Sequence, residues 1–342
     1  MINYLSLFSG IGAFESAMKN LNIPFNLVGF SELDEYAIKS YCAIHNMSES
    51  LNLGDITKID EKALPKVDFI TYGFPCQDFS HAGKKQGLFN DDGTKTRSGL
   101  FFDALRIIEH TQPKVAIAEN VKNLTGNKFK DEFKIVLDSL ESAGYNNYWK
   151  VLRASDFGVP QSRERVFIIS IRKDCDTGIF EFPETYPLTR TLQDLLENVV
   201  SNEYDVNHDC YEYYLDLSEK QVGTKWEGRC NKDYINPKVA HTLSVRGTRH
   251  QRPGVSNIIS KKNHQEISVV DYKKSPLEIG DLRWLTPKEC FRLMGFDDES
   301  FHRAEAVNSN TQLYKQAGNS IVVDVAEELL CMLFDEDGDF FI

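Results

Sequence analysis

Cys76 is the residue in this chain whose type and surroundings point most directly to chemistry. It lies in the segment GFPCQDFS, residues 73–80, directly after an apolar run that predicts a strand. A cysteine is usually a small buried hydrophobic side chain, but the neighbouring proline and polar residues favour a loop here. A thiol in a loop can act as a covalent nucleophile when a positive local field favours its thiolate form.

Three more candidates adjoin predicted strands further along the chain. Glu119 ends an apolar run in the sequence AENV. A carboxylate at that position more often caps or pairs with a base, but it can also exchange protons with a substrate. Arg163 and Arg165 belong to the segment QSRER, which leads into another strand, where arginines are normally solvated. Each residue alone is weak evidence for a catalytic role. A shared site requires secondary-structure elements that bring these residues together.

Those elements alternate between strand and helix through the first half of the chain. We expect strands at 4–8, 27–31, 67–72, 115–119, 149–153 and 165–171. The first expected helix ends near residue 19, and the others lie at 35–45, 100–110 and 129–143. Alternation of this kind predicts an α/β fold with a mostly parallel sheet and helices on both faces. Such sheets bind ligands at the carboxyl ends of their strands, where Cys76 and Glu119 stand.

The alternating pattern fades after about residue 172. Residues 174–280 are polar, turn-rich and weakly periodic, which indicates a smaller second domain. Regular helix returns at the sequence TPKE, residues 286–289, which reads as a capping box with proline at the first helical position. Gly295 is the candidate C-terminal cap, and a last amphipathic helix is expected at 321–334.

A glycine turn follows the first predicted strand in the sequence FSGIG, residues 8–12. Gly10 and Gly12 allow a tight turn and a close approach of the backbone to a ligand. Glu32, at the end of the second strand, is placed to bind ribose hydroxyl groups, and Asp55 follows the next short element. The third glycine of a dinucleotide fingerprint is absent, which favours an adenosyl ligand without phosphates.

Composition narrows the class of protein. The net charge is −12, but basic residues predominate between 225 and 262, a pattern that fits contact with a polyanion or an ordinary solvated loop. No apolar run is long enough to span a membrane, and the N-terminus does not read as a signal peptide. The seven scattered cysteines predict reduced thiols in the cytoplasm, with no disulfide framework and no metal site.

Together the motifs resemble the DNA (cytosine-5) methyltransferase family, in its bacterial or phage, restriction-modification-like form. The resemblance rests on the motifs above, in the family's order, with RWLTPKE at 283–289 and QAGNS at 316–320. It implies a Rossmann-like, S-adenosylmethionine-dependent methyltransferase domain with a smaller inserted target-recognition domain. We therefore expect a catalytic domain at 1–190, completed by 301–342, and a target-recognition domain at 191–300.

The resemblance also implies roles for individual residues. Cys76 would attack carbon 6 of a cytosine flipped out of the duplex, Glu119 would bind ring N3 and the exocyclic amine, and Arg165 would reach O2 with support from Arg163. The loop after the cysteine would close over the base. Residues matching the family's cofactor positions are Phe8, Gly10, Gly12, Glu32, Asp55, Pro75, Leu100, Asn319 and Ser320, and candidate DNA contacts are Ser80, Thr242, Arg246, Arg249 and Arg252.

Double-stranded DNA is the expected partner, and the arginines of 239–254 favour a recognition sequence with at least one guanine. We expect a monomer without membrane association, and a cognate restriction endonuclease would be a functional rather than a physical partner. Two alternatives stay open: methylation of tRNA cytosine with the same chemistry, and a non-catalytic DNA-binding protein. A small-molecule methyltransferase or a nicotinamide oxidoreductase would explain the first hundred residues but not the cysteine, glutamate and arginine set.

Overall fold

The described residues fold into two compact units. The structure is a computed structural model, and it describes residues 1–75, 79, 87–90, 92–206, 234–243, 257–261, 267–268, 281–335 and 338–340. The first unit takes in residues 1–153, 164–184 and 325–342, and the second takes in 154–163 and 185–324. The functional division that we expect near residues 190 and 300 stays a prediction.

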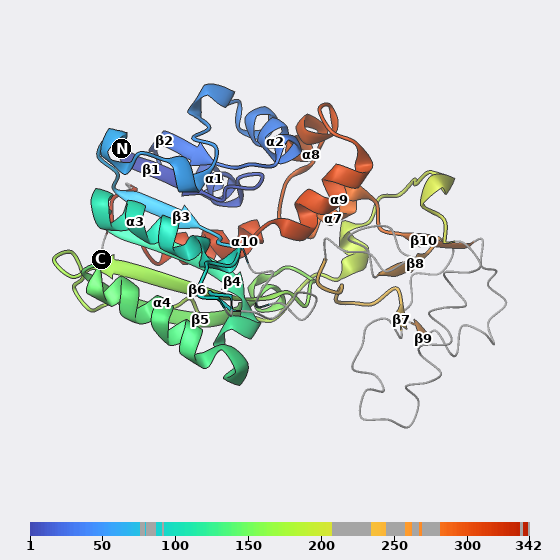
Figure 1. Ribbon diagram of the computed structural model, residues 1–342. Coiled ribbons are helices and arrows are strands. Elements are labelled where there is room, and N and C mark those ends of the chain that lie inside the picture. Colours follow the sequence, from blue (N-terminus) through green and yellow to red (C-terminus); the bar gives the residue numbers. More distant parts are fainter. Residues whose placement is uncertain are drawn as a thin grey trace. The chain divides into compact units, whose positions relative to one another are not determined.

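A six-stranded sheet forms the centre of the first unit (Figure 1). Its strand order is β2-β1-β3-β4-β6-β5, and β2, β1, β3 and β4 are parallel neighbours, whereas β6 runs antiparallel to both β4 and β5. The α/β fold with a mostly parallel sheet is therefore confirmed. The strands are β1 (Ile2–Leu7), β2 (Phe25–Ser31), β3 (Phe69–Tyr72), β4 (Val115–Val121), β5 (Tyr145–Arg153) and β6 (Glu164–Arg172).

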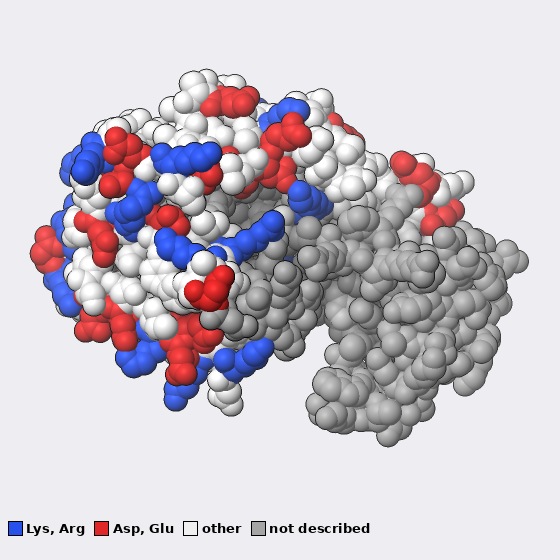
Figure 2. Space-filling model, in the orientation of Figure 1, with Lys and Arg blue, Asp and Glu red and all other residues white. Residues whose placement is uncertain are grey.

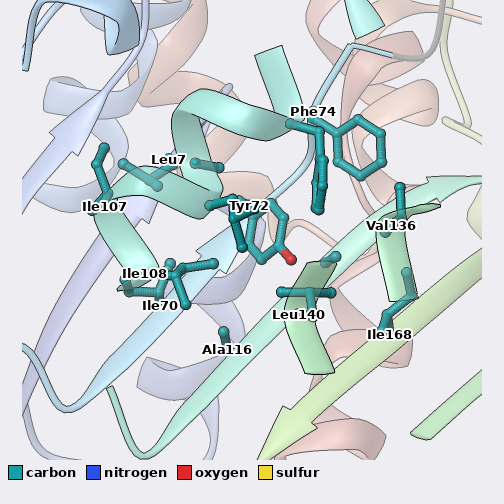
Figure 3. Close-up of a cluster of buried hydrophobic side chains, with 14 of the residues drawn as sticks. Leu7, Ile70, Tyr72, Phe74, Ile107, Ile108, Ala116, Val136, Leu140 and Ile168 are labelled. Carbon is teal, nitrogen blue, oxygen red and sulfur yellow. The ribbon is translucent and has the colours of Figure 1, made fainter. Parts of the chain in front are cut away.

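Helices cover both faces of this sheet. One face packs against α3 and α4 through a buried apolar cluster that includes Ile70, Tyr72, Ile108 and Leu140 (Figure 3). The other face meets α1, α2 and α10, where Phe30 stacks on Tyr41 with ring centroids 4.1 Å apart. Alternate residues of each strand serve the two faces. The helices are α1 (Ala13–Asn20), α2 (Glu35–His45), α3 (Phe101–Thr111), α4 (Lys130–Ser142) and α10 (Val323–Cys331).

A buried carboxyl group lies between the sheet and the helices α1 and α2. Glu15 is 1% exposed, and its Oε1 accepts hydrogen bonds from the hydroxyls of Tyr41, at 2.8 Å, and Tyr4, at 3.3 Å. The hydroxyl of Thr71 extends this hydrogen-bond network through a bond to the hydroxyl of Tyr4. Burial raises the pKa of Glu15 despite these donors, because removal from water penalises the charged form.

We predict that Glu15 makes the stability of the protein fall as the pH rises. The folded state holds the Glu15 proton above the unfolded-state pKa of about 4.3, so folding is progressively penalised between that pH and the raised folded pKa. Glu15→Gln keeps an acceptor for both tyrosines and removes this penalty. Urea unfolding across a pH series should show the variant gaining stability relative to the wild type as the pH rises. A constant difference at every pH would contradict the prediction.

Among its described residues, the second unit contains a small sheet and three helices. The sheet has the strand order β10-β8-β7-β9, and none of its strands exceeds three residues. Thr286 and Glu289 form the predicted capping box, and the Glu289 carboxylate also pairs with buried Arg283 at 2.7 Å. The elements are β7 (Tyr234–Ile235), β8 (Ile258–Ser260), β9 (Ile267–Ser268), β10 (Leu282–Trp284), α7 (Pro287–Arg292), α8 (Asp298–Glu305) and α9 (Asn310–Asn319).

Charged side chains of both signs are interspersed over the visible surface of the described residues (Figure 2). Among those residues, none of the helices combines the length and the apolar character that crossing a bilayer would need. The same residues contain no group of three histidine, cysteine or acidic side chains placed to hold a metal ion.

Candidate active site

The segments that carry the sequence motifs leave one edge of the parallel sheet. The FSGIG turn follows β1, Glu32 follows β2, and the GFP segment at 73–75 follows β3 (Figure 1). Glu119 and Asn120 lie near the carboxyl end of β4. Because the four strands are parallel neighbours, their carboxyl ends meet at this edge. The sequence-predicted residues that follow these four strands therefore share one region.

The FSGIG turn depends on left-handed backbone at three positions. Phe8, Gly10 and Gly12 have φ angles of 54°, 56° and 81°. A Cβ atom at Gly12 would lie 2.1 Å from Nε2 of His45, so the turn packs directly against that ring. A Cβ atom at Gly10 would meet nothing within 4 Å among the described residues. Only the backbone at Gly12 is pressed against the protein, and Gly10 leaves room for a ligand.

His45 supports the turn through a hydrogen bond of defined direction. Its Nε2 lies 2.9 Å from the carbonyl oxygen of Ile11, and its Nδ1 lies 3.2 Å from the Lys19 ammonium. An ammonium group can only donate, so Nδ1 accepts and Nε2 carries the hydrogen. His45 therefore donates to Ile11, and Lys19 fixes the tautomer that makes this possible.

The two acidic side chains that the sequence assigns to an adenosyl ligand, Glu32 and Asp55, both accept hydrogen bonds from backbone amides. Glu32 accepts hydrogen bonds from the backbone amides of Gly10 (2.9 Å), Leu33 (2.8 Å) and Asp34 (2.9 Å), which fixes its orientation beside the turn. Asp55 caps a short 3₁₀ turn, and hydrogen bonds from Thr57 hold the pKa of Asp55 below its usual value. A carboxylate offers acceptor atoms, which suits hydroxyl and amine donors.

We predict that Gly12→Ala destabilises the turn more than its backbone angle alone explains. A non-glycine residue in left-handed backbone costs about 1–2 kcal/mol, and here the added methyl group also collides with His45. Gly178→Ala is the matched control, because Gly178 has a φ of 77° and open space around a Cβ atom. Urea unfolding should show a larger loss of stability for Gly12→Ala than for Gly178→Ala. Equal losses would refute the proposed packing of Gly12 on His45.

Three side chains hold the backbone on both sides of Cys76. Cys76 and Ser80 lie outside the described residues, but Phe74, Pro75 and Phe79 do not. The buried amide of Asn120 donates to the carbonyl of Phe74 at 3.0 Å, and the hydroxyl of Ser98 donates to that of Pro75 at 2.6 Å. Asn123 donates to the carbonyl of Phe79. The segment with the nucleophile candidate is thus anchored before and after the cysteine.

We predict that Asn120→Asp lowers kcat, because aspartate loses the hydrogen that Phe74 accepts and adds a charge beside its carbonyl. A buried acceptor left unsatisfied costs about 1–3 kcal/mol, so a control must separate misplacement of Cys76 from simple instability. Asn147→Asp is the control variant. Asn147 lies in β5, and its amide also donates to a backbone carbonyl, that of Leu137, at 3.3 Å. Steady-state kinetics should show a fall of kcat for Asn120→Asp alone; equal kcat in both variants would disprove the anchoring role.

Glu119 and Arg165 form an ion pair with 2.8 Å between Oε1 and Nε. The pair is largely enclosed, with 14% of the Glu119 side chain and 18% of the Arg165 side chain exposed. Glu119 Oε2 also lies 3.5 Å from the position of a Cβ atom at Gly73, three residues before Cys76. The strand pairing of β4 with β6 places the two side chains together, since Val121 faces Arg165 in the register.

The other predicted residues are divided between the two units. Pro75 and Leu100 are half-buried in the first unit, whereas Asn319 and Ser320 belong to the second unit, at the end of α9. Arg163 is buried in the second unit and donates to the backbone carbonyls of Leu243, Gly318 and Ser320. Thr242 bonds to the carbonyl of Ser162. The predicted DNA contacts outside the described residues are Arg246, Arg249 and Arg252.

Several residues in this region were not among the sequence candidates. Asn120 adjoins Glu119 in the AENV motif, so its position in the motif was an available signal. Ser98, Asn123 and His45 carry no such signal, because their partners are backbone carbonyls that only the fold brings near.

The comparison with protein families now decides the affiliation. The model of the C-5 cytosine-specific DNA methylase family matches residues 2–334. This chain belongs to that family. Enzymes of this family are S-adenosylmethionine-dependent methyltransferases that modify DNA, so the resemblance read from the motifs is confirmed.

Relatives cover nearly the whole chain. The type II methyltransferase M2.ScrFI of Lactococcus lactis subsp. cremoris is 36% identical over 98% of this chain and 99% of its own length. The orphan methyltransferase M.SPRI of Bacillus phage SPR is 33% identical over 96% of each chain. The crystal structure of S. pombe Dnmt2 methyltransferase has a TM-score of 0.71 at 23% identity, over 96% of this chain and 97% of that one, and it supports the fold alone.

Proposed function

We propose that this chain transfers a methyl group from S-adenosylmethionine to carbon 5 of a cytosine flipped out of double-stranded DNA. The observation that carries the proposal is the enclosed Glu119–Arg165 pair beside the anchored segment of Cys76. A nucleophile, a carboxyl group and a guanidinium directed at one pyrimidine ring are what cytosine activation needs. Family membership favours the same reaction.

The cofactor proposal rests on the turn after β1. Gly10 leaves open space beside the backbone, and Glu32 and Asp55 present acceptors for ribose hydroxyls and the adenine amine. Phe8, Gly12, Pro75 and Leu100 would complete the contacts in the first unit, and cofactor contacts by Asn319 and Ser320 stay a prediction from the sequence. Bound S-adenosylmethionine supplies an electrophilic methyl group on a positively charged sulfur. The residues present therefore fit this cofactor.

Cys76 would begin the reaction by adding its thiolate to carbon 6 of the cytosine. The new bond breaks the aromaticity of the ring and moves an electron pair toward carbon 5, which becomes nucleophilic. Glu119 would hydrogen-bond N3 and the exocyclic amine and share a proton with N3 as charge develops there. Arg165 would hold O2. After carbon 5 is methylated, its proton leaves and the electron pair that is released expels the Cys76 thiolate.

The duplex imposes a second requirement, since the ring can be reached only outside the stack. Flipping costs a few kcal/mol of lost stacking and pairing, and Ser80 and the loop after it would close over the extruded base. The target-recognition domain at 191–300 would read the sequence in the DNA through the segment at 239–254. Thr242, Arg246, Arg249 and Arg252 are its proposed contacts, and the arginines favour guanine.

We predict that the purified chain methylates duplex DNA and not tRNA. Incubation with labelled S-adenosylmethionine should incorporate label into DNA, and bisulfite sequencing of DNA from expressing cells should reveal one recurrent sequence with its methylated cytosine. Label in total tRNA with none in DNA would instead establish the tRNA alternative. No label in either would favour a non-catalytic protein.

We predict that Cys76→Ser abolishes methyl transfer while DNA binding survives, because a serine hydroxyl is a far weaker nucleophile than a thiolate. The wild type should be trapped on duplexes with 5-fluorocytosine at the target, because fluorine cannot leave carbon 5 as a proton does. Denaturing gels would show the adduct as a shifted band that requires Cys76. Continued turnover by the serine variant, or no adduct with the wild type, would exclude the covalent mechanism.

The oligomeric state, the cellular location and an associated endonuclease are separate proposals. We infer a monomer in the cytoplasm. The names of the relatives include both type II and orphan methyltransferases, so a cognate restriction endonuclease is a proposal of its own. Protection of the methylated sequence from a restriction endonuclease that cuts there would support it.

A further inference from the structure

Two side chains of the QSRER motif converge on the backbone of a single residue. Gln161 is fully buried, and its Oε1 accepts a hydrogen bond from the amide of Leu243 at 3.3 Å. Arg163 is 3% exposed, and its Nη1 donates to the carbonyl of Leu243 at 3.2 Å. Both polar groups of the Leu243 backbone therefore bond to side chains of this motif. All three residues belong to the second unit.

The main chains of the two segments also lie side by side. The amide of Ser162 donates to the carbonyl of Ala240 at 2.8 Å, and the amide of Ala240 donates to the carbonyl of Pro160 at 2.7 Å. Thr242 adds a bond from its hydroxyl to the Ser162 carbonyl at 3.3 Å. The two backbone hydrogen bonds form an isolated parallel β-bridge between Gln161 and Ala240.

The same two side chains reach outward to helix ends of the second unit. Gln161 Nε2 donates to the carbonyl of Leu293, just after α7, at 2.7 Å. Arg163 Nη2 donates to the carbonyls of Gly318 and Ser320, at 3.2 and 2.6 Å, where α9 ends. Buried donors of this kind hold their partners strongly, because an unmade hydrogen bond in the interior is costly. Leu243 is thereby fixed against two helices.

We propose that Gln161 and Arg163 are positioning residues for sequence recognition. The inference rests on the proposed function, in which the segment at 239–254 reads the bases. Leu243 lies three residues before Arg246, the first arginine of that segment, so the two side chains fix the backbone that precedes these arginines. Loosening Leu243 would then blur the choice between DNA sequences more than it slows methyl transfer at the correct one.

The experiment compares Gln161→Met and Arg163→Lys with Arg283→Lys. Methionine keeps the length of Gln161 without its amide, and lysine keeps the charge of Arg163 without its fork. Arg283 is a matched control, because it is also buried in the second unit, at 4% exposed, and bonds to Trp284 and Glu289. Once the recognition sequence is known, kcat/KM is measured on that duplex and on duplexes with one base pair changed.

We expect both test variants to lose about tenfold in the ratio of cognate to altered kcat/KM, a part of what one mismatched pair typically costs. Arg163→Lys should also raise the KM for S-adenosylmethionine, since Arg163 holds the backbone around Asn319, whereas Gln161→Met should not. Arg283→Lys should lower the melting temperature without changing the ratio.

Two results would overturn the inference: unchanged discrimination in both variants, or an equal loss in Arg283→Lys, which would indicate general loosening of the unit. Failure of the proposed function is a separate result, because the wild type itself would then methylate no DNA.

Discussion

Parallel pairing of β2, β1, β3 and β4 is the constraint on which the candidate site depends. It sends the ends of four strands to one edge, so that residues between positions 8 and 120 meet without any local sequence relation. β6 then returns antiparallel to β4 and brings Arg165 opposite Val121, within reach of Glu119. A sheet with a different strand order would separate the acid from the guanidinium, whatever their sequence motifs.

Hydrogen bonds to backbone carbonyls recur as the means by which this protein fixes its functional segments. His45 supports the turn after β1 through Ile11, and Asn120 holds the segment before Cys76 through Phe74. A carbonyl is present at every position, so such supports constrain shape without restricting the side chains of the segment that they hold. The functional side chains are thereby spared for substrate and cofactor.

The sequence predicts the long elements well and the short ones poorly. The helix expected at 35–45 is α2 itself, because Asp34 caps its start and Asn46 ends it in left-handed backbone. The strand expected at 149–153 begins earlier, at Tyr145, since an edge strand mixes buried and exposed residues and weakens the alternating signal. Strands of two or three residues in the second unit are too short for any periodicity.

The candidate site shows the same division. Cys76, Glu119 and Arg165 could be singled out because their types and spacing match a reaction, and the structure pairs the last two. Lys19 could not, because its role is to set the tautomer of a histidine in another helix. Arg163 reads like Arg165 in the motif, yet it bonds to carbonyls inside the second unit. Strand periodicity cannot reveal that the chain passes from one compact unit to the other after Arg163.

The hydrogen bonds to the backbone of Leu243 have a consequence for how an enzyme of this kind could change its DNA target. The hydrogen bonds of Gln161 and Arg163 go to the amide and carbonyl of Leu243, so these bonds do not depend on the side chains that follow position 243. The residues after Leu243 can therefore be substituted while the same two side chains keep its backbone in place. Under the proposed function, a change of DNA target would therefore need substitutions in the segment at 239–254 alone, with Cys76, Glu119 and Arg165 unchanged.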